Sequence, residues 1–168
     1  MSVLRIGHIN IRVLDMEEAV SHYSNVLGMK VVHKDAAGNI YLKAWDEWDK
    51  FSVILSQAES AGMNHIAYKV KSDADLDSYK QRIKDYGVEV EDLPPGEIEF
   101  VGRTLKFNLP SGHLMYLYAE KEFVGIDVGS TNPDPWPKDT KGCAVHWLDH
   151  ALLMCELNPD EQINKVAE

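Results

Sequence analysis

The sequence predicts an α+β domain made of two copies of one unit, a strand followed by a helix and three further strands. Two observations carry this prediction. Apolar residues alternate with polar ones over 4–14 and again over 63–71, which is the period-two pattern of a half-buried strand. Each segment is followed by apolar residues at three- and four-residue spacing, and each of these amphipathic helices ends at a glycine, Gly28 or Gly87.

The first unit can be followed element by element. Asp15, with Glu18 three residues later, forms a capping-box pattern that predicts the start of the first helix. Beyond Gly28, the pair Gly38-Asn39 is a turn signal between strand candidates. Three strands are expected, at about 29–35, 40–46 and 50–56.

The second unit repeats this order. Ser72 or Asp73 can cap its helix, and a turn at 110–113 separates its last two strands. His8 and His65 hold the same place in the two units, which indicates an internal duplication. The units span about 1–57 and 58–120, and the second has strands near 88–92, 99–108 and 114–119.

The remainder of the chain has a different composition. Glycine and proline interrupt any regular element over 121–142, so this segment is interpreted as a linker on the surface. Residues 145–156 then look like another first strand, and the chain ends where a following helix should still be running. We therefore expect 1–120 to be one domain and 143–168 to be the truncated start of a second domain.

Composition and charge exclude several classes of protein. The net charge is −10 and no basic patch is evident, so no nucleic-acid partner is expected. No apolar run approaches the roughly 18 residues of a membrane span, so no membrane association is expected either. The two cysteines have no metal-like spacing, which favours a reducing compartment and a cytoplasmic protein.

Three side chains of the first domain could belong to a metal site. If the two first strands line one concave face, His8 and His65 would supply two ligands of a non-haem Fe(II) triad. The last strand should supply a carboxylate, but it carries Tyr116, and phenolate is a poor substitute for carboxylate with Fe(II). We therefore interpret His8, His65 and Tyr116 as a vestigial site in a domain that binds no metal.

His150 lies in the third first-strand pattern, at the place that His8 occupies in the first unit. A lone histidine in an apolar strand is most often a core residue, and spacing alone leaves metal ligation open. Short motifs add information about this position. They are Gly7-His8 with Arg12-Val13-Leu14-Asp15-Met16, Tyr41-Leu42-Lys43-Ala44-Trp45 with Asp49-Lys50-Phe51, Pro110-Ser111-Gly112-His113 with Leu117-Tyr118-Ala119, Asn132-Pro133 with Trp136-Pro137, and Leu148-Asp149-His150-Ala151-Leu152.

In these motifs the chain resembles the extradiol catechol 2,3-dioxygenases. Their vicinal-oxygen-chelate superfamily, which includes glyoxalase and bleomycin-resistance-like proteins, is built from paired βαβββ units. The resemblance implies a structural N-terminal domain and an Fe(II) site in a following catalytic domain. It places the first iron ligand on His150 and sets Leu152, on the same strand face, at the border of the substrate pocket.

The activity implied by the resemblance is the extradiol cleavage of catechol or a substituted catechol by O2, which gives a 2-hydroxymuconic semialdehyde in the degradation of aromatic compounds. The other ligands and the acid–base residue would lie beyond Glu168, so the chain alone is expected to be inactive. The family also suggests a homotetramer. Two alternatives remain: a complete single-domain glyoxalase- or resistance-type metalloprotein, and a metal-free module that binds small molecules.

Overall fold

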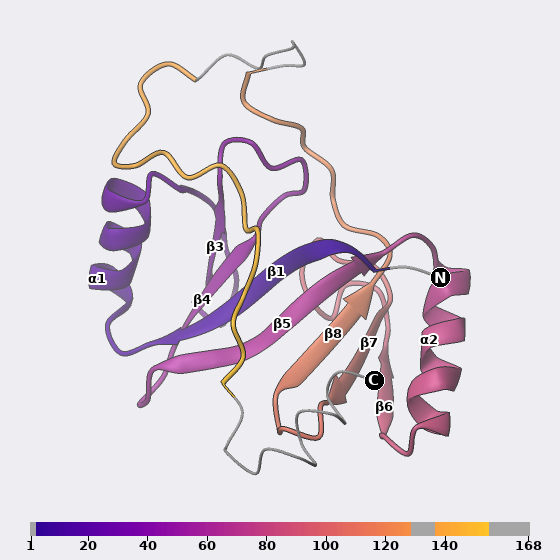
Figure 1. Ribbon diagram of the computed structural model, residues 1–168. Helices are drawn as coiled ribbons and strands as arrows, with labels where there is room; N and C mark the ends of the chain where they lie inside the picture. Colours follow the sequence, from indigo (N-terminus) through magenta and orange to yellow (C-terminus); the bar gives the residue numbers. More distant parts are fainter. Residues whose placement is uncertain (1–2, 129–136, 155–168) are drawn as a thin grey trace. The chain divides into compact units, whose positions relative to one another are not determined.

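A computed structural model describes residues 3–128 and 137–154 of the chain. The first unit forms in the predicted order of strand, helix and three strands (Figure 1). Its elements are β1 (Val3–Val13), α1 (Met16–Ser21) continued by a π-helical turn (His22–Val26), β2 (Lys30–Lys34), β3 (Ile40–Lys43) and β4 (Val53–Gln57).

The second unit repeats this order, so the predicted pair of βαβββ units is confirmed. The helix caps follow the sequence signals, because the side chain of Asp15 accepts a hydrogen bond from the Glu18 amide and that of Ser72 accepts one from the Asp75 amide. The elements are β5 (Gly62–Val70), α2 (Asp73–Asp85), β6 (Val90–Leu93), β7 (Thr104–Asn108) and β8 (Leu114–Tyr118).

Strand pairing is the same in the two units. The first strand of each unit pairs in parallel with the fourth, in the register Ile9 to Val53 for β1 and β4 and Ile66 to Met115 for β5 and β8. The remaining neighbours pair antiparallel, which gives the orders β1-β4-β3-β2 and β5-β8-β7-β6. This matching topology supports the internal duplication that the sequence indicates.

Each unit has its own apolar core between helix and strands. In the first, Leu42 and Leu55 are fully buried where α1 packs against β4. In the second, α2 packs against β6, β7 and β8 (Figure 1). Leu76 of α2 and Leu105 of β7 are fully buried in this core. Removing these apolar side chains from water is the main source of stability for each core.

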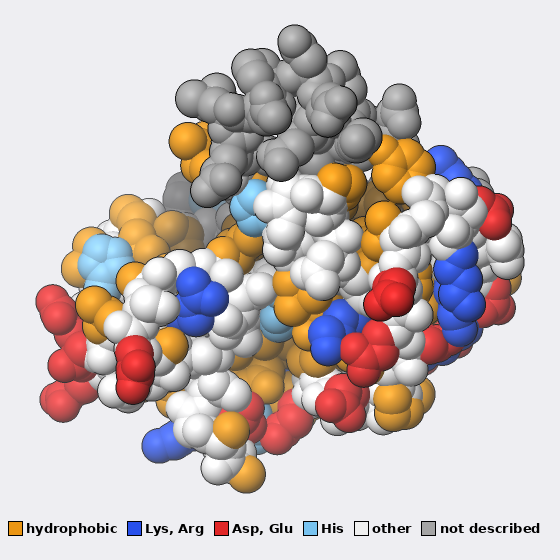
Figure 2. Space-filling view, turned by 90° about the horizontal axis from the view of Figure 1, so that it is seen from below, with side chains coloured by type: hydrophobic (Ala, Val, Ile, Leu, Met, Phe, Trp, Pro, Cys, Tyr) orange, Lys and Arg blue, Asp and Glu red, His pale blue; other side chains and the backbone are white. Residues whose placement is uncertain are grey.

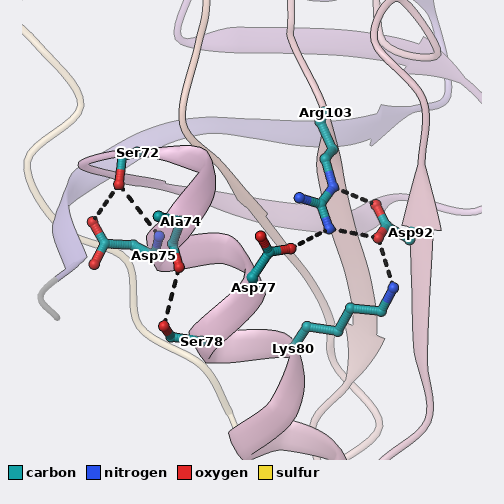
Figure 3. A network of polar contacts seen from close by, with 8 residues as sticks. All are labelled: Ser72, Ala74, Asp75, Asp77, Ser78, Lys80, Asp92 and Arg103. Atoms are coloured by element: carbon teal, nitrogen blue, oxygen red, sulfur yellow. Dashed lines mark hydrogen bonds and ion pairs between the residues drawn. The ribbon is translucent and has the colours of Figure 1, made fainter.

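An ion-pair network also ties α2 to β6 and to Arg103, the residue before β7 (Figure 3). The guanidinium of Arg103 donates to both carboxylate oxygens of Asp92, over 2.8 and 2.7 Å, and also to Asp77 of α2 over 2.8 Å. The ammonium of Lys80 lies 2.7 Å from Asp92. The Arg103 guanidinium first, and Lys80 to a smaller extent, hold the pKa of the Asp92 carboxyl well below its usual range.

By contact density the chain divides into two compact units, each described on its own. One contains residues 7–64 together with 121–128 and 137–148, and the other contains the described residues among 1–6, 65–120 and 149–168. The segment predicted as a linker therefore belongs with the first βαβββ unit. The strand expected over 145–156, after this segment, is a difference from expectation. No strand forms over 145–154, and residues 155–156 lie outside the described residues.

Candidate functional site

His8 is fully buried on β1, and a lysine ammonium lies beside its ring. The ammonium of Lys121 lies 3.5 Å from the Nδ1 atom of His8 and donates to the carbonyl oxygens of Phe51, over 2.6 Å, and Gly7, over 3.2 Å. The same ammonium lies 3.5 Å from the centroid of the Phe51 ring. A positive charge thus sits beside the imidazole, where a metal ion would be repelled.

His65 and Tyr116, two of the predicted residues of the vestigial site, do lie together in their unit. Their rings stack with centroids 4.2 Å apart and planes inclined by 13°. Burial raises the pKa of the Tyr116 phenol, which disfavours the phenolate that a metal ligand would require. Over residues 3–128 and 137–154, no group of three or more histidine, cysteine or acidic side chains could hold a metal ion.

His150 is placed differently from these buried residues. Its side chain is 89% exposed, and its Nδ1 atom lies 3.0 Å from a carboxylate oxygen of Asp149. A carboxylate beside one ring nitrogen fixes the tautomer and leaves the other nitrogen available, which is the usual arrangement around a metal-ligating histidine. Leu152, the predicted border of the substrate pocket, is 83% exposed.

The segment that leads to His150 is held on the first unit along much of its described length. We call its described residues, 121–128 and 137–148, the strap. At the start of the strap, the Lys50 amide donates to the Glu122 carbonyl over 2.8 Å, and the Val124 amide donates to Trp48 over 2.9 Å. The rings of Trp48 and Phe123 stack at 5.5 Å. The strap therefore begins as a partner of the loop before β4.

Charge pairing holds the strap farther along. Asp127 lies 2.6 Å from the ammonium of Lys30 and 3.9 Å from that of Lys43. Lys43 is buried, and this desolvation lowers its pKa, while the neighbouring carboxylates of Asp127 and Glu47 oppose the shift. A buried cation needs such partners, so Asp127 both anchors the strap and compensates Lys43.

The end of α1 accepts the returning strap. The amides of Cys143 and Val145 donate to the carbonyl oxygens of Val26 and Leu27, over 2.9 and 3.0 Å. The last carbonyls of a helix have no partner within the helix, and here the strap supplies the donors. The approach is close enough that a Cβ on Gly142 would collide with the Val26 carbonyl.

The far end of the strap is held by the loop after β3. Residues 45–47 of this loop each contact one residue of the strap, at positions 144, 146 and 148. The indole nitrogen of Trp45 donates to Ala144 O over 3.1 Å. The Asp46 amide donates to His146 O over 3.2 Å, and the Leu148 amide donates to a carboxylate oxygen of Glu47 over 3.0 Å. Residues 144–148 are thus fixed without forming a strand.

These anchoring residues were not predicted as functional from the sequence. Trp45 lies in a motif that contributed to the family resemblance, but no role was assigned to it. Lys43 and Glu47 are the residues from which a partner could have been expected, because charged residues in an apolar strand and loop need a partner when they are buried. The partner segment, about 80 to 100 residues away in sequence, could not be identified from local pattern.

Two hollows of the second unit lie elsewhere. One has a volume of about 790 Å³ and is bordered by Lys84, Val88 and Lys106, and a second of about 490 Å³ is bordered by Tyr79 and Pro110. None of the predicted site residues borders either hollow. On the face shown in Figure 2, the described basic side chains alternate with acidic and apolar ones. No helix among the described residues is long and apolar enough to cross a membrane.

The repeat topology and the second unit define the class of domain. Residues 63–122 match the sequence model of the catechol 2,3-dioxygenase-like N-terminal domain, and the fold is the vicinal-oxygen-chelate fold. The resemblance to the extradiol dioxygenases that the sequence indicates is therefore confirmed, and residues 63–122 are similar to the N-terminal domains of that family.

Individual relatives extend the likeness along the chain. A metapyrocatechase from Pseudomonas sp. strain CF600 is 41% identical over 152 residues, which are 90% of this chain and 50% of that protein. A manganese-dependent 2,3-dihydroxybiphenyl 1,2-dioxygenase from Geobacillus genomosp. 3 is 28% identical over 71% of this chain and 38% of its own length. The chain spans about half the length, or less, of these curated relatives.

Solved structures give the same picture. The 2,3-dioxygenase LapB from Pseudomonas sp. KL28 superposes with a TM-score of 0.83 and 39% identity, over 89% of this chain and 52% of that one. Homoprotocatechuate 2,3-dioxygenase from Arthrobacter globiformis superposes with a TM-score of 0.69 and 27% identity, over 74% of this chain and 38% of that one.

Proposed function

We propose that this chain is the N-terminal part of an extradiol dioxygenase that cleaves catechol or a substituted catechol with O2 to a 2-hydroxymuconic semialdehyde. The observation that carries the proposal is the extent of the likeness, which includes both βαβββ units and reaches 90% of the chain at 41% identity to a metapyrocatechase. The first 120 residues act as a structural domain, and the chain passes through the strap into a catalytic domain whose first residues, from about 143 to 148, are docked on the first unit.

We propose His150 as the first iron ligand, and its surroundings support this role. The exposed imidazole has the Asp149 carboxylate at Nδ1, so Nε2 is left to face a metal ion. A bound Fe(II) ion would supply Lewis-acid and redox chemistry toward catechol and O2, and His150 would be one of the residues that hold it. Leu152, two residues farther on, would offer an apolar surface to the substrate ring.

We further propose that the first domain holds no metal. The Lys121 ammonium beside His8 and the neutral phenol of Tyr116 beside His65 both support this. One histidine cannot fix Fe(II) in a useful geometry, because the site needs its three protein ligands. The 168-residue chain is therefore expected to be inactive by itself and active as part of a longer, homotetrameric cytoplasmic protein.

The test is ring cleavage by the product of the complete gene, purified with Fe(II) and supplied with catechol. We expect the yellow semialdehyde to accumulate, and we expect His150→Ala to lower both bound iron and turnover at least about a hundredfold, because one of three ligands is lost. His33→Ala, which removes a histidine of β2, serves as the matched control and should retain both. Loss of iron on replacing His8 instead of His150 would contradict the proposal and favour a glyoxalase-type site in the first domain.

A further inference from the structure

The carboxylate of Glu47 joins two parts of the chain that lie 101 residues apart in sequence. One oxygen accepts the Ala44 amide of its own loop over 3.0 Å, and the other accepts the Leu148 amide of the strap over 3.0 Å. Glu47 is only 6% exposed. Both oxygens are thus used as acceptors at a site largely removed from water.

A buried carboxylate in this position requires a reason, because desolvation of its charge is costly. The nearby ammonium of Lys43 interacts favourably with the Glu47 charge, and the two amides hydrogen bond to it. Charge-assisted hydrogen bonds of this kind are roughly twice as strong as neutral ones. Glutamine could not replace this geometry, since its side chain offers a single acceptor oxygen where two donors converge.

The location of the second contact gives it functional meaning. Leu148, the last residue of the strap, makes this contact, and His150 follows two residues later. Two extended residues reach at most about 7 Å. Fixing Leu148 therefore limits how far the backbone of His150 can move from this anchor. A strap released at Leu148 would not impose this limit.

We propose that Glu47 is a positioning residue for the metal-ligating histidine. The inference rests on the proposed function for the role of His150, but the contact with Leu148 stands on its own. Glu47 acts through the strap and not by contact with metal or substrate. The first βαβββ unit then contributes to the metal site by holding the ligand segment at a defined starting point.

The first arm of the test measures the contact in the 168-residue chain by amide hydrogen exchange at Leu148. We expect Glu47→Ala to speed this exchange roughly tenfold, Glu47→Gln to give an intermediate effect, and the control Glu91→Gln to leave it unchanged. Glu91 is a suitable control because it is half-exposed in an ion pair with Lys106 of the other unit. Unchanged exchange in Glu47→Ala would overturn the proposal.

The second arm measures the dissociation constant of Fe(II), and of Mn(II) as a redox-stable probe, in the complete gene product. We expect Glu47→Ala to weaken binding about tenfold to a hundredfold while the melting temperature of the catalytic domain is unchanged, with Glu47→Gln between it and the unmodified protein. Equal metal affinity in all variants would overturn the positioning role. Failure of the unmodified protein to bind metal would refute the proposed function instead, and the exchange result would still decide the contact.

Discussion

Replacing Lys121 by methionine is the perturbation whose energetic consequence can be worked out most fully. The Lys121 ammonium is 8% exposed, donates to the carbonyls of Phe51 and Gly7, and lies over the Phe51 ring. Methionine fills a similar volume but has no donor. Two buried carbonyls would lose a charged donor at about 1–3 kcal/mol each, and a desolvated cation–π contact contributes about 2 kcal/mol.

These contributions are not additive, and relief of the buried charge offsets part of the loss. We therefore expect the free energy of unfolding to fall by about 3–5 kcal/mol, measured by urea denaturation followed by circular dichroism. The control is Lys50→Met, since Lys50 forms a partly exposed ion pair with Glu122 and should cost less than about 1 kcal/mol. A loss below about 1 kcal/mol for Lys121→Met would refute the argument that this ammonium is an integral part of the first unit.

Two further predictions concern an ion pair and a close backbone approach. Arg103 depresses the pKa of Asp92, so Asp92 stabilises the fold at pH values above its usual pKa of 3.8, and this contribution declines as the pH falls below that value. Urea unfolding should show Asp92→Asn to be destabilised by about 1–2 kcal/mol at pH 7 and by less at pH 2.5, and an equal difference at both pH values would contradict the assignment. Gly142→Ala should weaken docking of the strap, because its Cβ would collide with the Val26 carbonyl, and limited proteolysis should then cut the strap faster. Gly125→Ala, at a positive φ but with open space around it, should have the smaller effect, and equal cleavage of the two variants would argue against the close approach.

The fold was predictable because its determinants are local or periodic. Alternation identified β1 and β5, and the caps at Asp15 and Ser72 marked both helices. The repetition of the same order then supplied the topology, since equivalent elements pair alike in the two units. One local departure occurs at the end of α1, where Leu27 N donates to His22 O in a π-helical turn. No pattern in the sequence distinguishes that turn from an ordinary helix end.

The strap could not be predicted from local sequence, for two physical reasons. Its glycines and prolines remove periodicity, and its partners are single polar groups such as Trp45 Nε1 and the Glu47 carboxylate, about 100 residues away. Conversely, the alternation over 145–156 predicts a strand, but a strand needs a neighbour that offers a row of backbone groups. The Asp46 amide donates one hydrogen bond to the His146 carbonyl and its carboxylate lies 3.4 Å from the His146 ring, so the described part of that segment is held by single contacts and not by a ladder.

The site was predictable only in part. The sequence predicted His8, His65 and Tyr116 as one vestigial site, and the rings of His65 and Tyr116 do stack. No sequence pattern predicted that the Lys121 ammonium lies beside His8. The role of His150 came from resemblance and remains a prediction. Its exposure and the adjacent Asp149 carboxylate are the structural features that favour it.

The central claim, that this chain is the N-terminal part of a longer ring-cleaving enzyme, is tested most directly by the intact mass of the protein made by its native host. We predict a mass above 19.0 kDa by a further domain of about 100–150 residues, which would carry the ligands that accompany His150. A native product of 19.0 kDa would contradict the claim, because the described residues of this chain contain no complete metal triad.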